Sequence, residues 1–249
     1  MNTQDLAETT RAVQQESATT PTQQDFESFI YLISHDVRGS VRALMEIPQW
    51  IEEDMTSGGQ RVAPQMRAHI DMLNRHAQRL DRMLFDLLLY SRVGRMQIPA
   101  NIDLDVTLET VMDSMHIPAS FTVSRNFSQK LVRMGEPDAL TLFTVLISNA
   151  IKHHHREAGE IQISSRQNGQ SVLLRFTDNG PGIPAPMRAR AFEAMKTLRP
   201  RDEVEGSGMG LAIAQKIAET YDGTIVLSTG PGGIGTCVEV SLPGFPVLN

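Results

Sequence analysis

The chain has 249 residues, of which 41% are hydrophobic, so it can bury one large core or two modest ones. Its net charge of −6 argues against a nucleic-acid-binding surface as its main function. The single cysteine, Cys237, excludes an internal disulfide bond, and no apolar run approaches the roughly 20 residues that span a bilayer. We therefore expect a soluble, cytoplasmic protein with no membrane span and no nucleic-acid partner.

Residues 1–24 and the segment that follows them differ sharply in pattern. The first 24 residues are rich in Thr, Gln, Glu, Ala and Ser without an apolar period, which predicts a disordered linker. From Asp25 onward, apolar residues recur every three or four positions, as on one face of a helix. This stripe comprises Phe26, Ile30, Ile33, Val37, Val41 and Leu44. We expect Pro48 to kink the helix, and the Thr-Ser-Gly-Gly run at 56–59 to end it.

A second helix is predicted from a stricter apolar pattern, in which the spacing alternates between four and three residues. The pattern comprises Met66, Ile70, Leu73, Ala77, Leu80, Leu84, Leu87 and Ser91. Such a seam of about four heptads is typical of helices that pack as a coiled coil. An isolated pair of antiparallel helices buries such a seam poorly, whereas two pairs form a four-helix bundle. We therefore expect residues 25–96 to form a homodimer.

The pattern beyond Gly94 is mixed. Helices are expected at 106–115, 138–153 and 211–221, and strands at 161–166, 172–177, 225–228 and 236–242. Asn168-Gly169 is expected to turn the first two strands into a hairpin, and the last two strands form another. Cys237 lies in the last strand and is expected to be buried. The predicted fold is thus multi-domain, an α-helical hairpin followed by an α+β sandwich.

The first of four chemically suggestive blocks is Ser34-His35-Asp36 on the first helix. His35 falls beside the apolar stripe rather than within it. Asp36 can hold the proton of one ring nitrogen and leave the other nitrogen free to attack, which suits a nucleophile. A lone histidine is more often an ordinary surface residue, and only the other blocks favour the functional interpretation.

The second block, Asn149 to His153, ends an amphipathic helix. The side-chain oxygen of Asn149 is a hard ligand suited to a Mg²⁺ ion that nucleotide phosphates also bind. Lys152 would bring a positive charge to the phosphates, with His153 beside them. Taken alone, the block is equally consistent with a plain helix end.

The third and fourth blocks are rich in glycine. Asp178 follows a predicted strand, and its carboxylate can accept a hydrogen bond from the adenine amine, while Gly180 and Gly182 let the backbone approach the ring. A plain turn is the competing interpretation. The fourth block precedes a helix, where backbone amides form an anion site for phosphates. Its residues are Gly206, Gly208, Gly210 and Leu211. It follows no strand, which disfavours a dinucleotide-binding fold.

Over about residues 25–243, the order of these blocks resembles the histidine kinases of two-component signalling. His35 with Asp36 resembles the H-box, and Asn149 with Lys152 resembles the N-box. The other boxes are matched by Asp178, Gly180 and Gly182 (first G-box), Phe192 (F-box), Gly206, Gly208 and Gly210 (second G-box) and Gly235-Thr236 (last G-box). In that last box the Thr236 hydroxyl is expected to lie near the adenine-binding aspartate.

The resemblance implies two domains. Residues 25–96 would form a dimerisation and histidine-phosphotransfer domain, and residues 97–249 a Bergerat-type ATPase domain that binds ATP and Mg²⁺. The implied enzyme is a protein histidine kinase that phosphorylates its own His35, with Asp36 as base or orienting group. The phosphoryl group would then pass to an aspartate in the receiver domain of a response regulator, acting in trans. Because no sensor domain is recognisable, either the chain is a fragment or a separate sensor protein signals to it.

Four positions depart from the pattern of this family, and one of them, Ser40, replaces a common proline, which should leave the helix straighter below His35. Val145 stands where the family usually has Asn or an acid, which predicts low ATP affinity or turnover. Gly39 has no side chain to position a hydrolytic water, which predicts weak phosphatase activity towards the regulator. Met195 replaces an F-box aromatic and is expected to pack similarly.

Two alternatives remain open. A phosphotransfer or scaffold pseudokinase would share the fold without productive use of ATP. A serine kinase of the anti-sigma-factor type would share only the ATPase fold and would need no helical hairpin.

Overall fold

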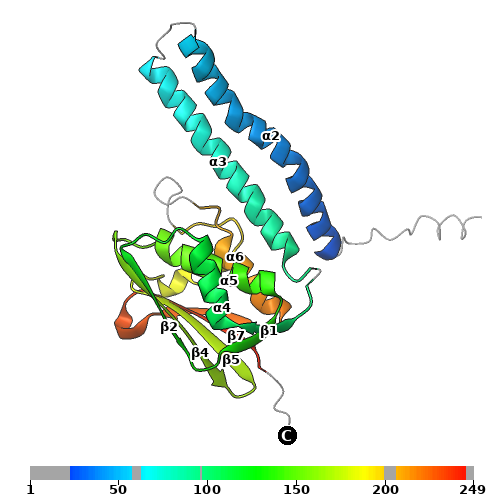
Figure 1. The fold of residues 1–249 in the computed structure, drawn as a ribbon, viewed down its shortest axis with the longest axis vertical. Helices are drawn as coiled ribbons and strands as arrows, with labels where there is room; N and C mark the ends of the chain where they lie inside the picture. The colour runs from blue at the N-terminus through cyan, green and yellow to red at the C-terminus, as the bar shows by residue number, and fades with distance from the viewer. Residues whose placement is uncertain (1–22, 58–62, 96, 199–205, 245–249) are drawn as a thin grey trace, which may run out of the picture.

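A computed structural model describes residues 23–57, 63–95, 97–198 and 206–244, with side chains described from Val37 onward. Residues 1–22, which make up most of the expected N-terminal linker, lie outside the described residues. A long helical hairpin precedes a layered α/β domain, and the second hairpin helix passes beside that domain (Figure 1). No helix in the described ranges combines the length and apolarity that crossing a membrane requires.

The hairpin consists of α2 (Gln23–Ser57) and α3 (Pro64–Arg92). Helix α2 continues through Pro48, as expected from the apolar pattern on both sides of it, and ends at Ser57. Helix α3 begins with Pro64 directly after its N-cap residue. Proline is tolerated there because the first amides of a helix have no partner within the helix. His35 and Asp36 lie within α2.

The predicted seam of α3 divides into two halves with a seven-residue period. Ile70, Ala77, Leu84 and Ser91 are buried. Met66, Leu73 and Leu80, which alternate with them, each expose between 39% and 44% of their surface. One chain therefore buries only half of its coiled-coil pattern.

The α/β domain is built on a five-stranded sheet with the order β2-β4-β5-β7-β6. Its strands are β2 (Phe121–Phe127), β4 (Gly159–Asn168), β5 (Ser171–Asp178), β6 (Thr224–Thr229) and β7 (Thr236–Pro243). Strand β2 pairs in parallel with β4, and the other neighbours are antiparallel. Two short strands, β1 (Ala100–Asp103) and β3 (Leu131–Met134), form a separate antiparallel pair. The sequence pattern did not predict β1, β2 or β3.

Helices α4 (Leu104–Ser114), α5 (Glu136–Lys152) and α6 (Gly210–Thr220) cover one face of the sheet (Figure 1). Burial alternates along β4 and β5, as expected for strands with one face in a core. The core between the layers includes Phe143 and Ile147 of α5, Ile213 of α6, and Ile163 and Leu174 of the sheet. The predicted α+β sandwich is therefore confirmed.

The β4–β5 hairpin turns one residue later than predicted. Asn168 pairs with Ser171, so the two-residue turn is Gly169-Gln170 rather than Asn168-Gly169. Gly169 has a φ of 62°. The first position of a tight hairpin turn needs this left-handed backbone, and glycine adopts it without strain.

Candidate active site

Asp178 is the last residue of β5 and is held by two backbone amides. Its Oδ1 atom accepts hydrogen bonds from the amides of Gly180, at 2.8 Å, and Thr236, at 3.1 Å. Thr236 begins β7, the neighbour of β5 in the sheet. The sheet thus brings the first and last predicted G-boxes together around the Asp178 carboxylate. Both amides bind Oδ1, so Oδ2 is the oxygen that these amides leave without a bond.

Close backbone packing around Asp178 depends on two glycines with left-handed backbones. A Cβ atom on Gly182, where φ is 74°, would lie 2.9 Å from the carbonyl oxygen of Gly235. A Cβ atom on Gly235, where φ is also 74°, would lie 1.8 Å from the carbonyl oxygen of Asp178. Only glycine fits at either position, so both loops can close against the end of β5.

The predicted N-box occupies the last turn of α5. Lys152 ends the helix, and His153 is its C-cap residue, with its amide donating to the carbonyl oxygen of Asn149 at 3.1 Å. The side chain of Asn149 lies against the start of α6. A Cβ atom on Gly210 would come within 2.8 Å of Asn149 Nδ2 and 3.0 Å of its Oδ1. The structure therefore brings Asn149 and the second G-box into direct contact.

The second G-box forms the entry to α6. Gly208 has a φ of 76°, and a Cβ atom there would lie 2.5 Å from the carbonyl oxygen of Lys196. The hydroxyl of Ser207 accepts a hydrogen bond from the amide of Met209 at 3.1 Å. The loop leads into α6, which begins at Gly210 and continues with Leu211, and the first amides of a helix have no acceptor within the helix itself.

The segment between the first two G-boxes spans residues 183–205. Its first part contains two short 3₁₀ helices, η1 (Ala185–Met187) and η2 (Arg190–Phe192), and residues 199–205 lie outside the described part. Phe192 packs against the domain core. Met195 has a φ of 61° and exposes 41% of its surface. The expectation that Met195 packs like an F-box aromatic stays a prediction.

The hairpin contacts the α/β domain through α3. Ser207 donates a hydrogen bond to Asp86, and Lys216 of α6 donates from Nζ to the carbonyl oxygen of Tyr90 at 2.7 Å. Lys216 Nζ also lies 4.3 Å from the centre of the Tyr90 ring. Burial raises the pKa of the Asp86 carboxyl, and the hydrogen bond from Ser207 and the charges of Lys152 and Arg82 oppose that shift.

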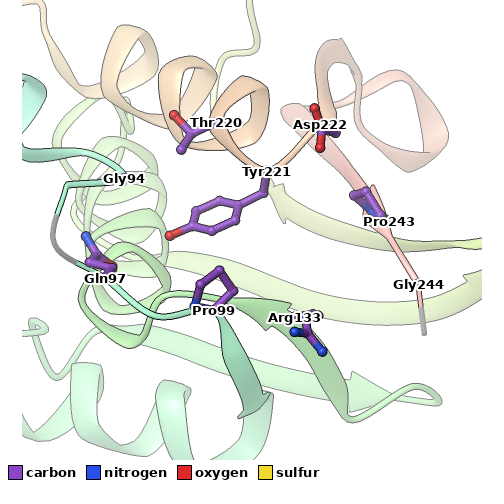
Figure 2. Close-up of a pocket in the computed structure, with 9 residues that line it drawn as sticks. All are labelled: Gly94, Gln97, Pro99, Arg133, Thr220, Tyr221, Asp222, Pro243 and Gly244. Atoms are coloured by element: carbon purple, nitrogen blue, oxygen red, sulfur yellow. The ribbon is translucent and has the colours of Figure 1, made fainter. Parts of the chain in front are cut away.

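A second junction holds the linker between the two parts of the chain. Asp138, which is 3% exposed, accepts hydrogen bonds from the Gly94 amide at 2.9 Å, from Gln97 Nε2 at 2.8 Å and from the Tyr221 hydroxyl at 2.7 Å. The Tyr221 hydroxyl in turn accepts from the Gly135 amide at 2.9 Å. Figure 2 shows the Tyr221 ring extending from the end of α6 towards Gln97. No spacing in the sequence indicated this network.

The hollow in Figure 2 has a volume of about 330 Å³. Linker residues and the ends of α6 and β7 line it, and neither Asp178 nor Asn149 is among its lining residues. This hollow is therefore separate from the candidate nucleotide site.

His154 is a further residue that the sequence interpretation missed. Its Nε2 atom lies 3.0 Å from Asn179 Oδ1, which also accepts the Glu160 amide at 2.8 Å. The His154 ring packs edge-on against Phe121 at 5.3 Å. It thus ties the end of the N-box to the residue after Asp178. In the sequence it was only one of three consecutive histidines.

The fold and the boxes around Asp178 define the class of this domain. Residues 135–245 match the family described as histidine kinase-, DNA gyrase B- and HSP90-like ATPases. This part of the chain is an ATPase domain of that family, and the recognition of a Bergerat-type domain from the boxes is confirmed.

Along most of its length the chain is similar to known histidine kinases. It is 28% identical to the methanogenesis regulatory histidine kinase FilI of Methanothrix harundinacea, over 88% of this chain and 25% of FilI. It is 27% identical to the probable sensor histidine kinase TcrY of Mycobacterium tuberculosis, over 89% of this chain and 47% of TcrY. The chain thus spans between a quarter and a half of the length of these two relatives.

Solved structures share the fold across both parts of the chain. Full-length ShkA, in complex with AMPPNP, aligns with a TM-score of 0.63 at 21% identity, over 87% of this chain and 45% of ShkA. The histidine kinase AdeS of Acinetobacter baumannii aligns with a TM-score of 0.57 at 20% identity, over 83% of this chain and 98% of that structure.

Proposed function

We propose that the chain is the kinase core of a two-component system. It binds Mg-ATP, phosphorylates His35 and passes the phosphoryl group to an aspartate in the receiver domain of a response regulator. The observation that carries this proposal is the fixing of Asp178 by the amides of Gly180 and Thr236. A carboxylate oriented through one oxygen presents the other as an acceptor for the adenine amine.

The phosphates would lie between the end of α5 and the start of α6. Lys152 supplies a positive charge, with His153 next to it, and the loop of Gly206, Gly208 and Gly210 directs backbone amides and the helix N-terminus at an anion. Leu211 follows in the first turn of α6 and anchors it by packing against the core.

The residues present fit a Mg²⁺ ion through one side chain. Asn149 offers an amide oxygen, a hard ligand, where a Cβ atom on Gly210 would intrude. Val145, one turn earlier on α5, packs against the domain core and has no oxygen to offer. Asn149 would therefore hold the ion with the nucleotide's own oxygens, and bound Mg²⁺ would neutralise phosphate charge.

In the reaction, an imidazole nitrogen of His35 attacks the γ-phosphorus of ATP. The new nitrogen–phosphorus bond forms as the bond to the bridging oxygen breaks, and ADP leaves with that oxygen. Asp36 orients the ring or accepts its proton. Gly39, one helical turn after His35, offers no side chain to position a hydrolytic water, so phosphatase activity towards the regulator is weak.

The active unit is a homodimer formed through residues 25–96. Its support is the half of the α3 seam that a single chain leaves exposed, namely Met66, Leu73 and Leu80. A second hairpin would cover these side chains in a four-helix bundle.

The test is to incubate the chain with ATP labelled at the γ-phosphate. Acid-labile label should appear in the wild type and disappear in His35→Ala. His69→Ala, at an exposed histidine on α3, is the matched control and should keep the label. Acid-stable label on a serine would contradict the proposal.

One observation favours a second candidate. Because Val145 leaves α5 with one oxygen ligand fewer than the family pattern, the chain would act as a phosphotransfer scaffold if ATP binds without being used. Binding of AMPPNP without any acid-labile label from ATP would identify this case.

A further inference from the structure

A carboxylate of the hairpin reaches the phosphate side of the candidate nucleotide site. Asp86 of α3 accepts a hydrogen bond from the hydroxyl of Ser207, in the middle of the second G-box. Ser207 is 7% exposed, and its hydroxyl also accepts the amide of Met209, the residue before α6. The Ser207 hydroxyl thus links the Asp86 carboxylate to the loop amides that would face phosphate.

The positive charges near Asp86 are of the kind that would stabilise bound phosphates. Lys152, at the end of α5, and Arg82, one turn earlier on α3, both act on the Asp86 carboxylate and favour its charged form. The carboxylate therefore lies in the field of the N-box cation and beside the glycine loop at the same time. A nucleotide phosphate bound there would have the same neighbours and the same sign of charge.

The surrounding segments hold the carboxylate in this place. Gly208 packs against the backbone of Lys196, and Gly210 packs against Asn149, so the loop is pressed between its neighbours. Lys216 holds α3 against α6 through the Tyr90 carbonyl at 2.7 Å. Of these two contacts of α3 with the α/β domain, the one at Ser207 lies in the phosphate region.

We propose that Asp86 is an internal mimic of a nucleotide phosphate. When the hairpin is docked, the Asp86 carboxylate takes the anion position beside the Ser207 loop and Lys152, so docking and ATP binding compete. Because the coupling is reciprocal, bound ATP favours release of α3, and any signal that moves α3 alters the affinity for ATP. The inference rests on the proposed function, since it requires that this loop bind phosphates.

Asp86→Asn in the full chain tests the proposal. The amide keeps the size of the side chain and removes its charge, so affinity for Mg-AMPPNP, measured by calorimetry, should rise about tenfold, whereas affinity for adenosine should not change. Asp71→Asn, the same change at an exposed residue of the same helix, is the matched control and should leave both affinities unchanged.

A second variant loosens the docking away from the phosphates. Lys216→Met removes the contact with Tyr90, and it should also tighten Mg-AMPPNP binding. Thermal melting establishes that each variant is folded.

The possible results separate the two proposals. Equal Mg-AMPPNP affinities in the wild type and Asp86→Asn, or weaker binding by the variant, overturn the phosphate mimic and leave the kinase function standing. An equal rise in the affinity for adenosine also overturns it, because Asp86 would then affect binding of the nucleoside as well as of the phosphates. If neither protein binds Mg-AMPPNP or adenosine, both proposals fail.

Discussion

The hydroxyl of Tyr221 donates to the buried carboxylate of Asp138 at 2.7 Å and so ties the end of α6 to the start of α5. These helices carry the predicted second G-box and the predicted N-box. The same carboxylate also accepts from Gly94 and Gln97 in the linker. These hydrogen bonds offset the cost of removing the carboxylate from water.

Tyr221→Phe is expected to lower the free energy of unfolding by about 1–3 kcal/mol, because Asp138 loses a donor and the Gly135 amide loses its acceptor. Urea denaturation measures the change. Thr110→Val, which removes an exposed hydroxyl bonded only within α4, should change stability far less. Equal stability of wild type and Tyr221→Phe would show that the network contributes nothing.

The stability of the protein is also expected to depend on pH through Tyr221. Burial and the bond to Asp138 raise the pKa of Tyr221 above its ordinary value of 10.0. Above pH 10 the unfolded chain therefore loses this proton while the folded chain keeps it, and stability falls as pH rises. Subtracting the stability curve of Tyr221→Phe from that of the wild type isolates the effect. A flat difference between pH 9 and about 11 contradicts the prediction.

Asp178→Asn should weaken Mg-AMPPNP binding by about a hundredfold. The two backbone amides select the side-chain oxygen of the new residue, which turns its NH₂ group towards the adenine amine and sets donor against donor. Asp222→Asn, an exposed change of the same kind after α6, is the control. Calorimetric affinities that agree within twofold for Asp178→Asn and the wild type would exclude Asp178 from adenine recognition.

Gly208→Ala should both destabilise the domain and weaken nucleotide binding. Its backbone has a φ of 76°, and the new Cβ atom would collide with the carbonyl oxygen of Lys196. Gly169→Ala has a similar φ of 62° with nothing within 4 Å, so it measures the backbone strain alone, about 1 kcal/mol. Thermal melting should show a larger loss for Gly208→Ala, and equal losses would show that the collision is relieved.

Leu73→Glu combined with Leu80→Glu should yield monomers. Both leucines belong to the exposed half of the seam, so the charges leave the contacts within one hairpin intact and disrupt only the pairing of two hairpins. Analytical ultracentrifugation distinguishes the states. His76→Glu, at an exposed residue of α3 off the seam, should remain dimeric. A double variant that still sediments as the wild type does would place the dimer interface elsewhere.

Local pattern was sufficient to predict the long elements. The seam of α3 and the paired strands β4, β5, β6 and β7 have strong periods, because one face of each is buried in a core. Strand β2 was missed because it lies at the edge of the sheet and most of its residues are exposed. Strands β1 and β3 have only four residues each, too few to show a period.

The residues of the candidate site also divide into those that local pattern predicted and those that it did not. Glycine spacing and the position of Asp178 after a strand predicted which blocks meet, because the backbone constraints at these positions are local. The contacts of Asp86 with Ser207, of Asp138 with Tyr221 and of His154 with Asn179 join residues between 25 and 121 positions apart, so no local spacing marks them. Only the packing of the folded chain reveals these contacts.

The burial of Cys237 has a practical consequence. The chain has no other cysteine, and the 7% exposure of this thiol within β7 shields it from reagents in solution. Cysteines introduced at Gln78 on α3 and Gln215 on α6 would therefore accept fluorophores selectively in an otherwise native chain. Energy transfer between the two dyes would report in real time whether the helical hairpin and the α/β domain are together or apart.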